Sequence, residues 1–366
     1  MSLKMNINGF GTKGIHERPV TFAESLLTGR PVSREPQRVS PKLKARARPR
    51  FGRKSMAETF SVKVNRSMKR RTIRFWAGLI LGLTLAAQAL TGMFDLPSPT
   101  LGGRQLWTDV RVQGGWRVQC HAWTGHCRLL DTNDIRRTWG GEAEMLTALD
   151  RRIAIGDVRA PSAHAVVLVH GLGRSAHSLD ALATDLRTEG YEVVTFRYAS
   201  TRGTIAQHGA ALNRVLNGLK GSTRVSFVTH SLGAIVLRQA LNTSAPWRVR
   251  MALGRAVLLA PPNQGSQAAR TLSGNILADR VFGPALTELA DPDLGSRLPL
   301  STPFAIVAGT NDSMPFVDGV NDSVVSVEET KLNGSAKHLT VAASHTFIMD
   351  DKDAIAFAKD FLAVHN

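Results

Sequence analysis

The sequence predicts an α/β fold in which a mostly parallel central sheet carries helices on both faces, and three observations lead to that prediction. Short apolar runs alternate with helical patterns from residue 165 onward. Their order is strand, helix, strand over 165–170, 178–189 and 192–198. The pentapeptide THSLG at 229–233 lies between an apolar run and a helical segment. Parallel strands joined by crossover helices are buried on both faces, which accounts for their continuous apolar character.

The remaining elements of this domain continue the alternation. We expect a helix over 204–219, strands over 224–228, 255–260, 303–308 and 338–342, and a last helix over 353–364. The segment 265–300 interrupts the alternation, and we expect it to form a small cap over the site.

The net charge of +17 belongs almost entirely to the N-terminal segment. Residues 1–74 contain 19 Lys and Arg against four acidic residues, which leaves 27 basic and 25 acidic residues for the rest of the chain. The basic segment has no hydrophobic period and is interrupted by prolines, so we expect it to be disordered. No recognisable nucleic-acid-binding module accompanies the charge, and nucleic acid is therefore not an expected partner.

Residues 75–94 contain no charged residue and are long enough to cross a bilayer once as a helix. Four basic residues within 69–74 precede them, which would hold the N-terminal side in the cytoplasm. Alternatively, translation from Met68 would make the same segment a signal peptide with an A-x-A cleavage site at 87–89. Both interpretations place the rest of the chain outside the cytoplasm, either anchored to the membrane or secreted.

Residues 95–160 are rich in glycine and tryptophan and are expected to form a small β-rich lead-in to the main domain. Cys120 and Cys127 flank the turn residues 124–125 of a predicted hairpin, and in one register they lie directly opposite each other. A disulfide in an oxidising compartment and two reduced, packed thiols are both open. Zinc is not expected, because two cysteines and two histidines within one short hairpin lack the usual finger spacing. The predicted divisions of the chain are thus 1–74, 75–94, 95–160 and 161–366.

Ser231 is the candidate nucleophile. It stands at the apex of a predicted turn from strand to helix, which would expose its hydroxyl at the end of the sheet beside the N–H groups of a helix N-terminus. The surrounding residues nearly match the G-x-S-x-G pattern, with Thr229 in place of the first glycine. His345 follows the last predicted strand in a loop, so it is the candidate general base.

The candidate acid is Asp322, with Asp312 as the alternative. Both lie in loops before His345, and the β-branched run after Asp322 could fix its backbone. Either acid gives the chain order serine, acid, histidine. The oxyanion would be held by the N–H groups of Leu232, after the nucleophile, and Leu172, in a glycine-containing loop after the first strand.

Substrate contacts are expected from two loops that follow strands. One loop contributes His170 and Gly171, and the loop 260–265 contributes Asn263 and Gln264.

Residues 160–366 resemble the α/β-hydrolase superfamily, and more narrowly the small esterases and lipases with an HG oxyanion loop. The elbow is similar to the A-H-S-x-G variant of bacterial lipases, with Thr229 where that group has alanine. The segments 322–325 and 344–345 are similar to its acid and histidine segments. The resemblance implies an α/β-hydrolase fold that cleaves acyl esters of small molecules or lipids through an acyl-enzyme, with no metal or organic cofactor.

Three other functions remain open. An acyltransferase or thioesterase would use the same triad and acyl-enzyme. A non-catalytic, membrane-tethered binding protein is another alternative, because the branched side chain of Thr229 would crowd the elbow. The glycines in 171–176 also match the G-x-G-x-x-A dinucleotide fingerprint, with Arg197 placed to meet a 2′-phosphate, which would suit an NADP-binding oxidoreductase.

Overall fold

The computed structural model describes residues 98–99, 105–311 and 317–363. Every described residue belongs to the unit Arg66–Asn366. The predicted disordered segment 1–74 and the predicted anchor or signal at 75–94 lie outside the described residues. Within the described part of the chain, no helix is both long and apolar enough to span a bilayer.

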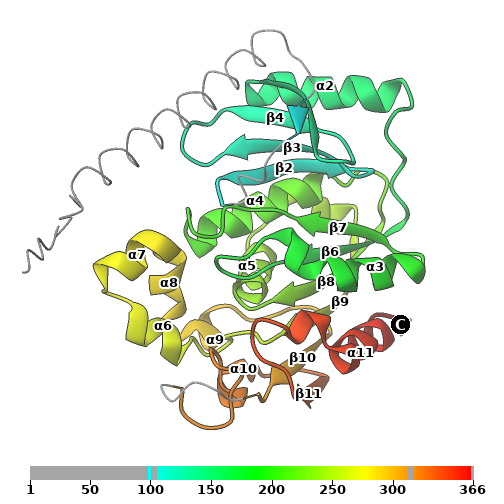
Figure 1. The fold of residues 1–366 in the computed structure, drawn as a ribbon. Helices are drawn as coiled ribbons and strands as arrows, with labels where there is room; N and C mark the ends of the chain where they lie inside the picture. Colours follow the sequence, from blue (N-terminus) through cyan, green and yellow to red (C-terminus); the bar gives the residue numbers. More distant parts are fainter. Residues whose placement is uncertain (1–97, 100–104, 312–316, 364–366) are drawn as a thin grey trace, which may run out of the picture. The chain divides into compact units, whose positions relative to one another are not determined.

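The main domain is built on a parallel sheet of six strands in the order β11-β10-β9-β8-β6-β7 (Figure 1). Every neighbouring pair in this sheet is parallel. Its strands are β6 His164–Val169, β7 Glu192–Phe196, β8 Arg224–His230, β9 Ala252–Leu259, β10 Phe304–Gly309 and β11 Lys337–Val341.

Helices cover both faces of this sheet, as predicted. They are α3 Asp180–Thr188, α4 Ile205–Gly218, α5 Leu232–Leu241 and α11 Lys352–Ala363, with short 3₁₀ turns η1 Ala176–Leu179, η2 Pro246–Val249 and η3 Ile348–Asp350. Val167 and Val169 of β6 pack in the core that includes α4 and α5, whereas Val166 and Leu168 pack in the core that includes α3 and α11. Successive side chains of a strand point to opposite faces, so one strand supplies both cores. Each fully buried Val or Leu contributes roughly 1.5–3 kcal/mol.

A second, antiparallel sheet precedes the main one along the chain. Its five strands lie in the order β1-β5-β4-β3-β2. They are β1 Ser98–Pro99, β2 Trp107–Gln113, β3 Trp116–His121, β4 Cys127–Leu130 and β5 Ile135–Gly140, followed by α2 Glu142–Ala154. Met145 and Leu149 of α2 are buried in a separate core against this sheet. Cys120 and Cys127 face each other across the β3–β4 ladder and form a disulfide, the first of the two alternatives that the sequence left open.

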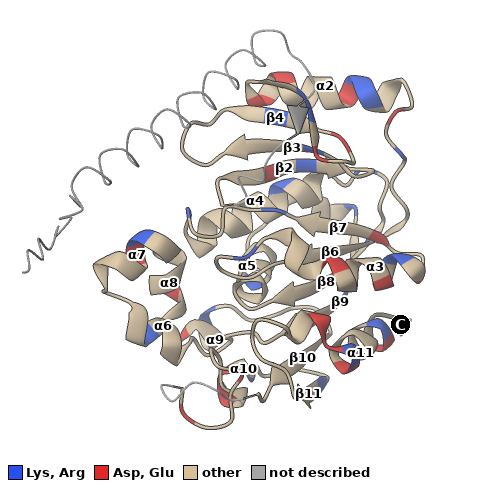
Figure 2. Ribbon diagram, viewed as in Figure 1, with Lys and Arg blue, Asp and Glu red and all other residues tan. Residues whose placement is uncertain are grey.

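Acidic and basic residues are interspersed over the described elements (Figure 2). Helices α2, α3 and α11 each carry both signs of charge. This mixture agrees with the near balance of charge that the sequence gives beyond residue 74.

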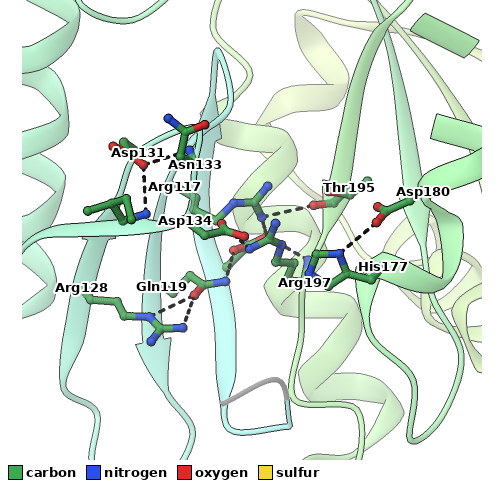
Figure 3. A network of polar contacts seen from close by, with 12 residues as sticks. Arg117, Gln119, Arg128, Asp131, Asn133, Asp134, His177, Asp180, Thr195 and Arg197 are labelled. Atoms are coloured by element: carbon green, nitrogen blue, oxygen red, sulfur yellow. Dashed lines mark hydrogen bonds and ion pairs between the residues drawn. The ribbon is translucent and has the colours of Figure 1, made fainter. Parts of the chain in front are cut away.

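The two sheets are joined by a buried polar network (Figure 3). Asp109 of β2 accepts hydrogen bonds from Arg117 Nη1 at 2.7 Å, Gln119 Nε2 at 2.9 Å and the backbone N–H of Arg197 at 2.8 Å. The side chain of Arg197 in turn donates to Asp134 at 2.6 Å. Burial lowers the pKa of Arg117, and the neighbouring Asp109 opposes that shift. Removal of either partner of such a buried ion pair would leave an uncompensated charge. The bond from the Arg197 N–H to Asp109 joins β2 to the end of β7.

The segment between β9 and β10 forms four short helices, where the sequence predicted a small cap. They are α6 Gln267–Leu272, α7 Ile276–Phe282, α8 Pro284–Leu289 and α9 Leu294–Arg297, and a further short helix, α10 Val327–Thr330, follows β10. Helix α8 buries Ala285, Leu286 and Leu289, whereas α7 has no buried residue. Gly283 separates the two helices, and its φ of 73° ends α7. Pro284 then begins α8.

Candidate active site

Ser231 occupies the turn between β8 and α5 with φ 53° and ψ −124°. A positive φ is strained for a residue that carries a Cβ, and such strain clusters at functional sites. The Ser231 N–H donates to the carbonyl oxygen of Leu259 over 2.9 Å, which ties the turn to the end of β9. The serine therefore lies at the carboxyl edge of the parallel sheet, where ligands of open α/β sheets bind.

Gly233 allows α5 to pass close to the end of β6. A Cβ at this position would overlap the carbonyl oxygen of Val169 and lie 2.8 Å from that of His170. Thr229 is fully buried and pairs with Val169 in the sheet, yet Ser231 adopts the strained turn. The crowding expected from Thr229 thus does not prevent the elbow, because the close approach of helix and strand is made at Gly233.

Ser231, His345 and Asp322 form one hydrogen-bonded row. His345 Nε2 lies 2.9 Å from Ser231 Oγ, and His345 Nδ1 lies 2.8 Å from Asp322 Oδ2. Because a carboxylate only accepts, the proton is assigned to Nδ1, which leaves Nε2 free to accept the serine proton. The other carboxylate oxygen accepts the N–H groups of residues 324–325 at 3.0 and 2.8 Å. The alternative acid, Asp312, lies outside the described residues.

His230, for which the sequence predicted no role, supports the loop that carries the base. Its Nε2 donates to the carbonyl oxygen of His345 over 2.9 Å. Burial, reinforced by the charge of Arg174 and by that of His345 once it takes a proton, holds the pKa of His230 well below its usual range, so its ring is neutral. Its position beside the nucleophile in the elbow was the only signal available from the sequence.

The two predicted oxyanion donors both lie close to the nucleophile. Leu232 is the first residue of α5, and the first N–H groups of a helix have no acceptor within the helix. Leu172 lies in the loop after β6 and lines the same cavity as Ser231. A Cβ on Gly171 would lie 3.0 Å from the Cβ of Ser231, so this loop packs directly against the nucleophile.

His170 supports this loop, and the structure does not place it in contact with the cavity. Its ring is buried and stacks on Tyr198 with the centroids 4.4 Å apart. Its Nδ1 donates to the carbonyl oxygen of Gly171 over 2.9 Å. Burial lowers the pKa of His170 to about 4. The expectation of a substrate contact is therefore replaced by a structural role, because the ring turns toward the core.

Asn263 and Gln264 also depart from their predicted role. Asn263 is fully buried, accepts from Arg238 Nη1 at 2.9 Å and donates to Thr330 O at 2.7 Å. Gln264 Nε2 donates to Lys331 O at 2.9 Å. Neither side chain is among the residues that line the cavity beside Ser231.

The hydrogen-bond partner of the Asn263 side-chain oxygen is Arg238. It lies on the apolar helix α5, is fully buried, and also donates to Leu294 O at 3.0 Å and Gly295 O at 2.8 Å. Burial lowers the pKa of its guanidinium to about 10. Through these bonds Arg238 fixes the segment after α8 and the loop after β9, a role that a lone arginine in a helix does not reveal in the sequence.

A cavity of about 540 Å³ opens beside the nucleophile. Ser231 and His345 line it, together with residues of α6, α7, α8 and the loop that carries Asp322. Its lining is largely apolar and includes Leu172, Pro262, Ala268, Ala269, Leu272, Phe282, Leu286, Leu289, Val317, Val324 and Val325. Such a volume and lining suit an apolar group of small-molecule size.

The dinucleotide alternative is not supported by this geometry. Residues 171–175 form a loop, the short 3₁₀ turn η1 follows, and α3 begins only at Asp180, so no long helix starts where a pyrophosphate would bind. Arg197, the expected phosphate contact, donates instead to Asp134 in the network between the sheets.

The domain that carries this site matches a known protein family. A model of the alpha/beta hydrolase family matches residues 166–355, just over half of the chain. No curated protein matches. The mature form of Bacillus licheniformis lipase BlEst2 shares 21% identity over 54% of this chain and 91% of that one, with a TM-score of 0.46. Phospholipase PlaB from Legionella pneumophila shares 16% over 55% and 60%, with a TM-score of 0.46. The metagenomic carboxyl esterase MGS0156 shares 24% over 50% and 64%, with a TM-score of 0.41.

Proposed function

The chain belongs to the alpha/beta hydrolase family, and from that premise we propose that it cleaves carboxylic esters through an acyl-enzyme formed on Ser231. The observation that carries the proposal is the row of two hydrogen bonds, 2.8 and 2.9 Å long, that joins Asp322, His345 and Ser231 at the edge of an apolar cavity. A serine hydroxyl is a weak nucleophile until a positioned base takes its proton. The arrangement supplies that base and the carboxylate that orients it.

In the first half of the reaction, Ser231 Oγ attacks the ester carbonyl carbon while its proton passes to His345 Nε2. Asp322 stabilises the resulting imidazolium. The N–H groups of Leu232 and Leu172 hold the negative oxygen of the tetrahedral intermediate. When the intermediate collapses, the bond to the alkoxy oxygen breaks, and His345 returns the proton to the departing alcohol.

In the second half, water clears the acyl group from Ser231. His345 takes a proton from the attacking water, the hydroxide adds to the acyl carbon, and the same N–H groups hold the new oxyanion. Collapse releases the carboxylic acid and returns the proton to Ser231 Oγ. An alcohol or thiol in place of water would give the transfer reaction, so the acceptor decides between hydrolase and acyltransferase.

The substrate is expected to carry an apolar acyl group. The cavity beside Ser231 has a volume of about 540 Å³ and is lined mainly by Leu, Val, Ala and Phe side chains from the cap and the acid loop. Burial of an apolar chain against them contributes about 25 cal/mol for each Å² removed from water. Small-molecule esters and lipid esters both fit this description.

We also propose that the domain works outside the cytoplasm. The Cys120–Cys127 disulfide would persist in an oxidising compartment, and the uncharged segment 75–94 supports either an anchor or a signal peptide. The N-terminal residue of the mature protein distinguishes these two possibilities. An N-terminus just after Ala89 would establish a cleaved signal, whereas an intact 75–94 segment in the membrane fraction would establish an anchor.

Labelling with a fluorophosphonate probe tests the proposed nucleophile. The wild type and a Ser296→Ala control, which changes an exposed serine of α9, should be labelled and should hydrolyse nitrophenyl esters. Ser231→Ala should lose both properties. A wild type that is neither labelled nor active would overturn the proposal. Product analysis with an added alcohol or thiol would reveal a transferase by formation of the acyl acceptor product in place of free acid.

A further inference from the structure

Gln105 lies just before β2, the first long strand of the N-terminal sheet, and outside the residues that match the family. We infer that it is a positioning residue for the oxyanion loop, which we define as residues 171–174, and this inference rests on the proposed function. The N-terminal sheet would thereby contribute to catalysis without contacting the substrate.

The side-chain amide of Gln105 holds the two residues that follow Leu172. Its Nε2 donates directly to the carbonyl oxygen of Arg174 over 2.7 Å. Its Oε1 accepts the hydroxyl proton of Ser200 over 3.2 Å, and Ser200 Oγ in turn accepts the N–H of Gly173 over 3.1 Å. One amide therefore fixes both the N–H of Gly173 and the carbonyl of Arg174.

The direction of these bonds requires an amide. The hydroxyl of Ser200 has one proton, and because Gln105 Oε1 accepts it, a lone pair of the oxygen is left for the N–H of Gly173. Ser200 is fully buried, so water does not reach its hydroxyl. A carboxylate at position 105 could still accept from Ser200, but it would face the carbonyl of Arg174 with a second acceptor.

Arg174 extends the support to the loop of the base. Its N–H donates to the carbonyl oxygen of Gly171 over 3.2 Å, which closes the turn around Leu172. Its guanidinium donates to the carbonyl oxygen of Thr346, next to His345, over 3.0 Å. A shift of the Arg174 backbone would thus move both the predicted oxyanion donor and the loop that presents the imidazole.

The expected effect is on the chemical step. Removal of an oxyanion donor costs about 10²–10³ in kcat, and a misplacement near 1 Å costs about 10²-fold. Loosening the loop should cost less than deleting the donor. We expect Gln105→Ala to lower kcat by about 10–100-fold with KM changed less than about twofold, because the apolar cavity that binds the acyl group is untouched.

Three variants and one control test the inference. Gln105→Ala removes the bonds to Arg174, Ser200 and Thr201. Gln105→Glu keeps the acceptor and removes the donor, and Ser200→Ala removes the link to Gly173. The control is Thr108→Val, which removes the bond from Ala199 N to Thr108 Oγ1 at 3.1 Å, a contact between the same two segments that does not reach the oxyanion loop. Each protein is compared with the wild type by kcat and KM on a nitrophenyl ester, by thermal unfolding, and by hydrogen exchange at the amides of 173–174.

The expected result is a loss of kcat in Gln105→Ala, Gln105→Glu and Ser200→Ala, with faster exchange at 173–174, while Thr108→Val keeps kcat even if its melting temperature falls. An unchanged kcat in Gln105→Ala, or an equal loss in Thr108→Val, would overturn the inference and leave the proposed function intact. A wild type that is neither labelled by the fluorophosphonate nor active on esters would overturn both. The labelling result therefore separates the two failures.

Discussion

Acid should destabilise this protein through two buried histidines. Burial lowers the pKa of both His170 and His208 from 6.5 to about 4. The ring of His170 stacks on Tyr198, and that of His208 lies edge-on to the same tyrosine. His170 Nδ1 donates to the carbonyl oxygen of Gly171, and His208 Nε2 donates to that of Ser200. Protonation of either ring would place a positive charge in this buried core.

The sign and size of the effect follow from linkage. Between pH 6.5 and 4 the unfolded chain binds these protons and the folded chain does not, so stability falls as the pH falls through that window. Above pH 6.5 the stabilisation is fully present. At pH 5, a group with these two pKa values has lost about 2 kcal/mol relative to pH 8, and the two histidines together about 4 kcal/mol. His230, whose pKa is also lowered, adds to the loss in the same direction.

Urea unfolding at pH 8 and pH 5 measures this loss. The wild type should lose at least about 4 kcal/mol of unfolding free energy between the two conditions. His208→Gln, which can still donate to Ser200 O, should lose about 2 kcal/mol less. Tyr198→Phe is the matched control, because it removes the bond from Tyr198 Oη to His170 O and leaves both histidines in place.

The pH dependence of the unfolding free energy in the wild type and the two variants tests the linkage argument. If the unfolding free energy of His208→Gln falls with pH as steeply as that of the wild type, the buried ring of His208 is not the source of the acid sensitivity. If Tyr198→Phe flattens the dependence as much as His208→Gln, loss of packing is responsible and the linkage argument fails.

Three further predictions concern the site. Asp322→Asn removes the charge that faces His345, so kcat on a nitrophenyl ester should fall by about 10⁴-fold; a fall below tenfold would exclude Asp322 as the acid. Gly233→Ala places a Cβ 2.8 Å from His170 O, so urea unfolding should show a loss of at least about 1–3 kcal/mol. Unchanged stability would contradict the close crossing. Leu286→Trp should fill the cavity and lower kcat/KM for long-chain esters at least tenfold relative to acetate esters; equal effects would place the acyl group elsewhere.

The parallel strands were predictable because strands buried on both faces must be apolar throughout. The runs expected at 303–308 and 338–342 correspond to β10 Phe304–Gly309 and β11 Lys337–Val341, shifted by one residue. Membership of the alpha/beta hydrolase family confirms the predicted fold class. The disordered segment and the anchor or signal segment stay predictions.

The candidate triad was predictable for a different reason. Ser231, Asp322 and His345 each lie where a loop leaves the sheet, and their order along the chain matched a known arrangement. The structure brings Ser231 and His345, 114 residues apart, to within 2.9 Å. Their catalytic roles stay predictions until the labelling and kinetic experiments are done.

The side-chain partners of the residues predicted to bind substrate were not predictable from the sequence. Asn263 stood in a suitable loop, but a buried guanidinium from α5 occupies its side-chain oxygen. The sequence around Arg238 does not show that its side chain is buried. An arginine in a mostly apolar helix has the same local pattern whether it is buried or exposed. Gln105 was overlooked for the same reason, because its partners lie 69 and 95 residues away.

The sequence by itself determined the strand and helix order, the turn that carries Ser231 and the chain order of the three triad candidates. These features depend on local hydrophobic period and on residues adjacent in the chain, so short windows contain them. Only the tertiary structure decided that Thr229 leaves the elbow intact, that Asn263 supports a loop, and that Gln105 reaches the oxyanion loop. The partner of a polar side chain depends on which distant backbone group packing brings within about 3 Å, and no local pattern records that choice.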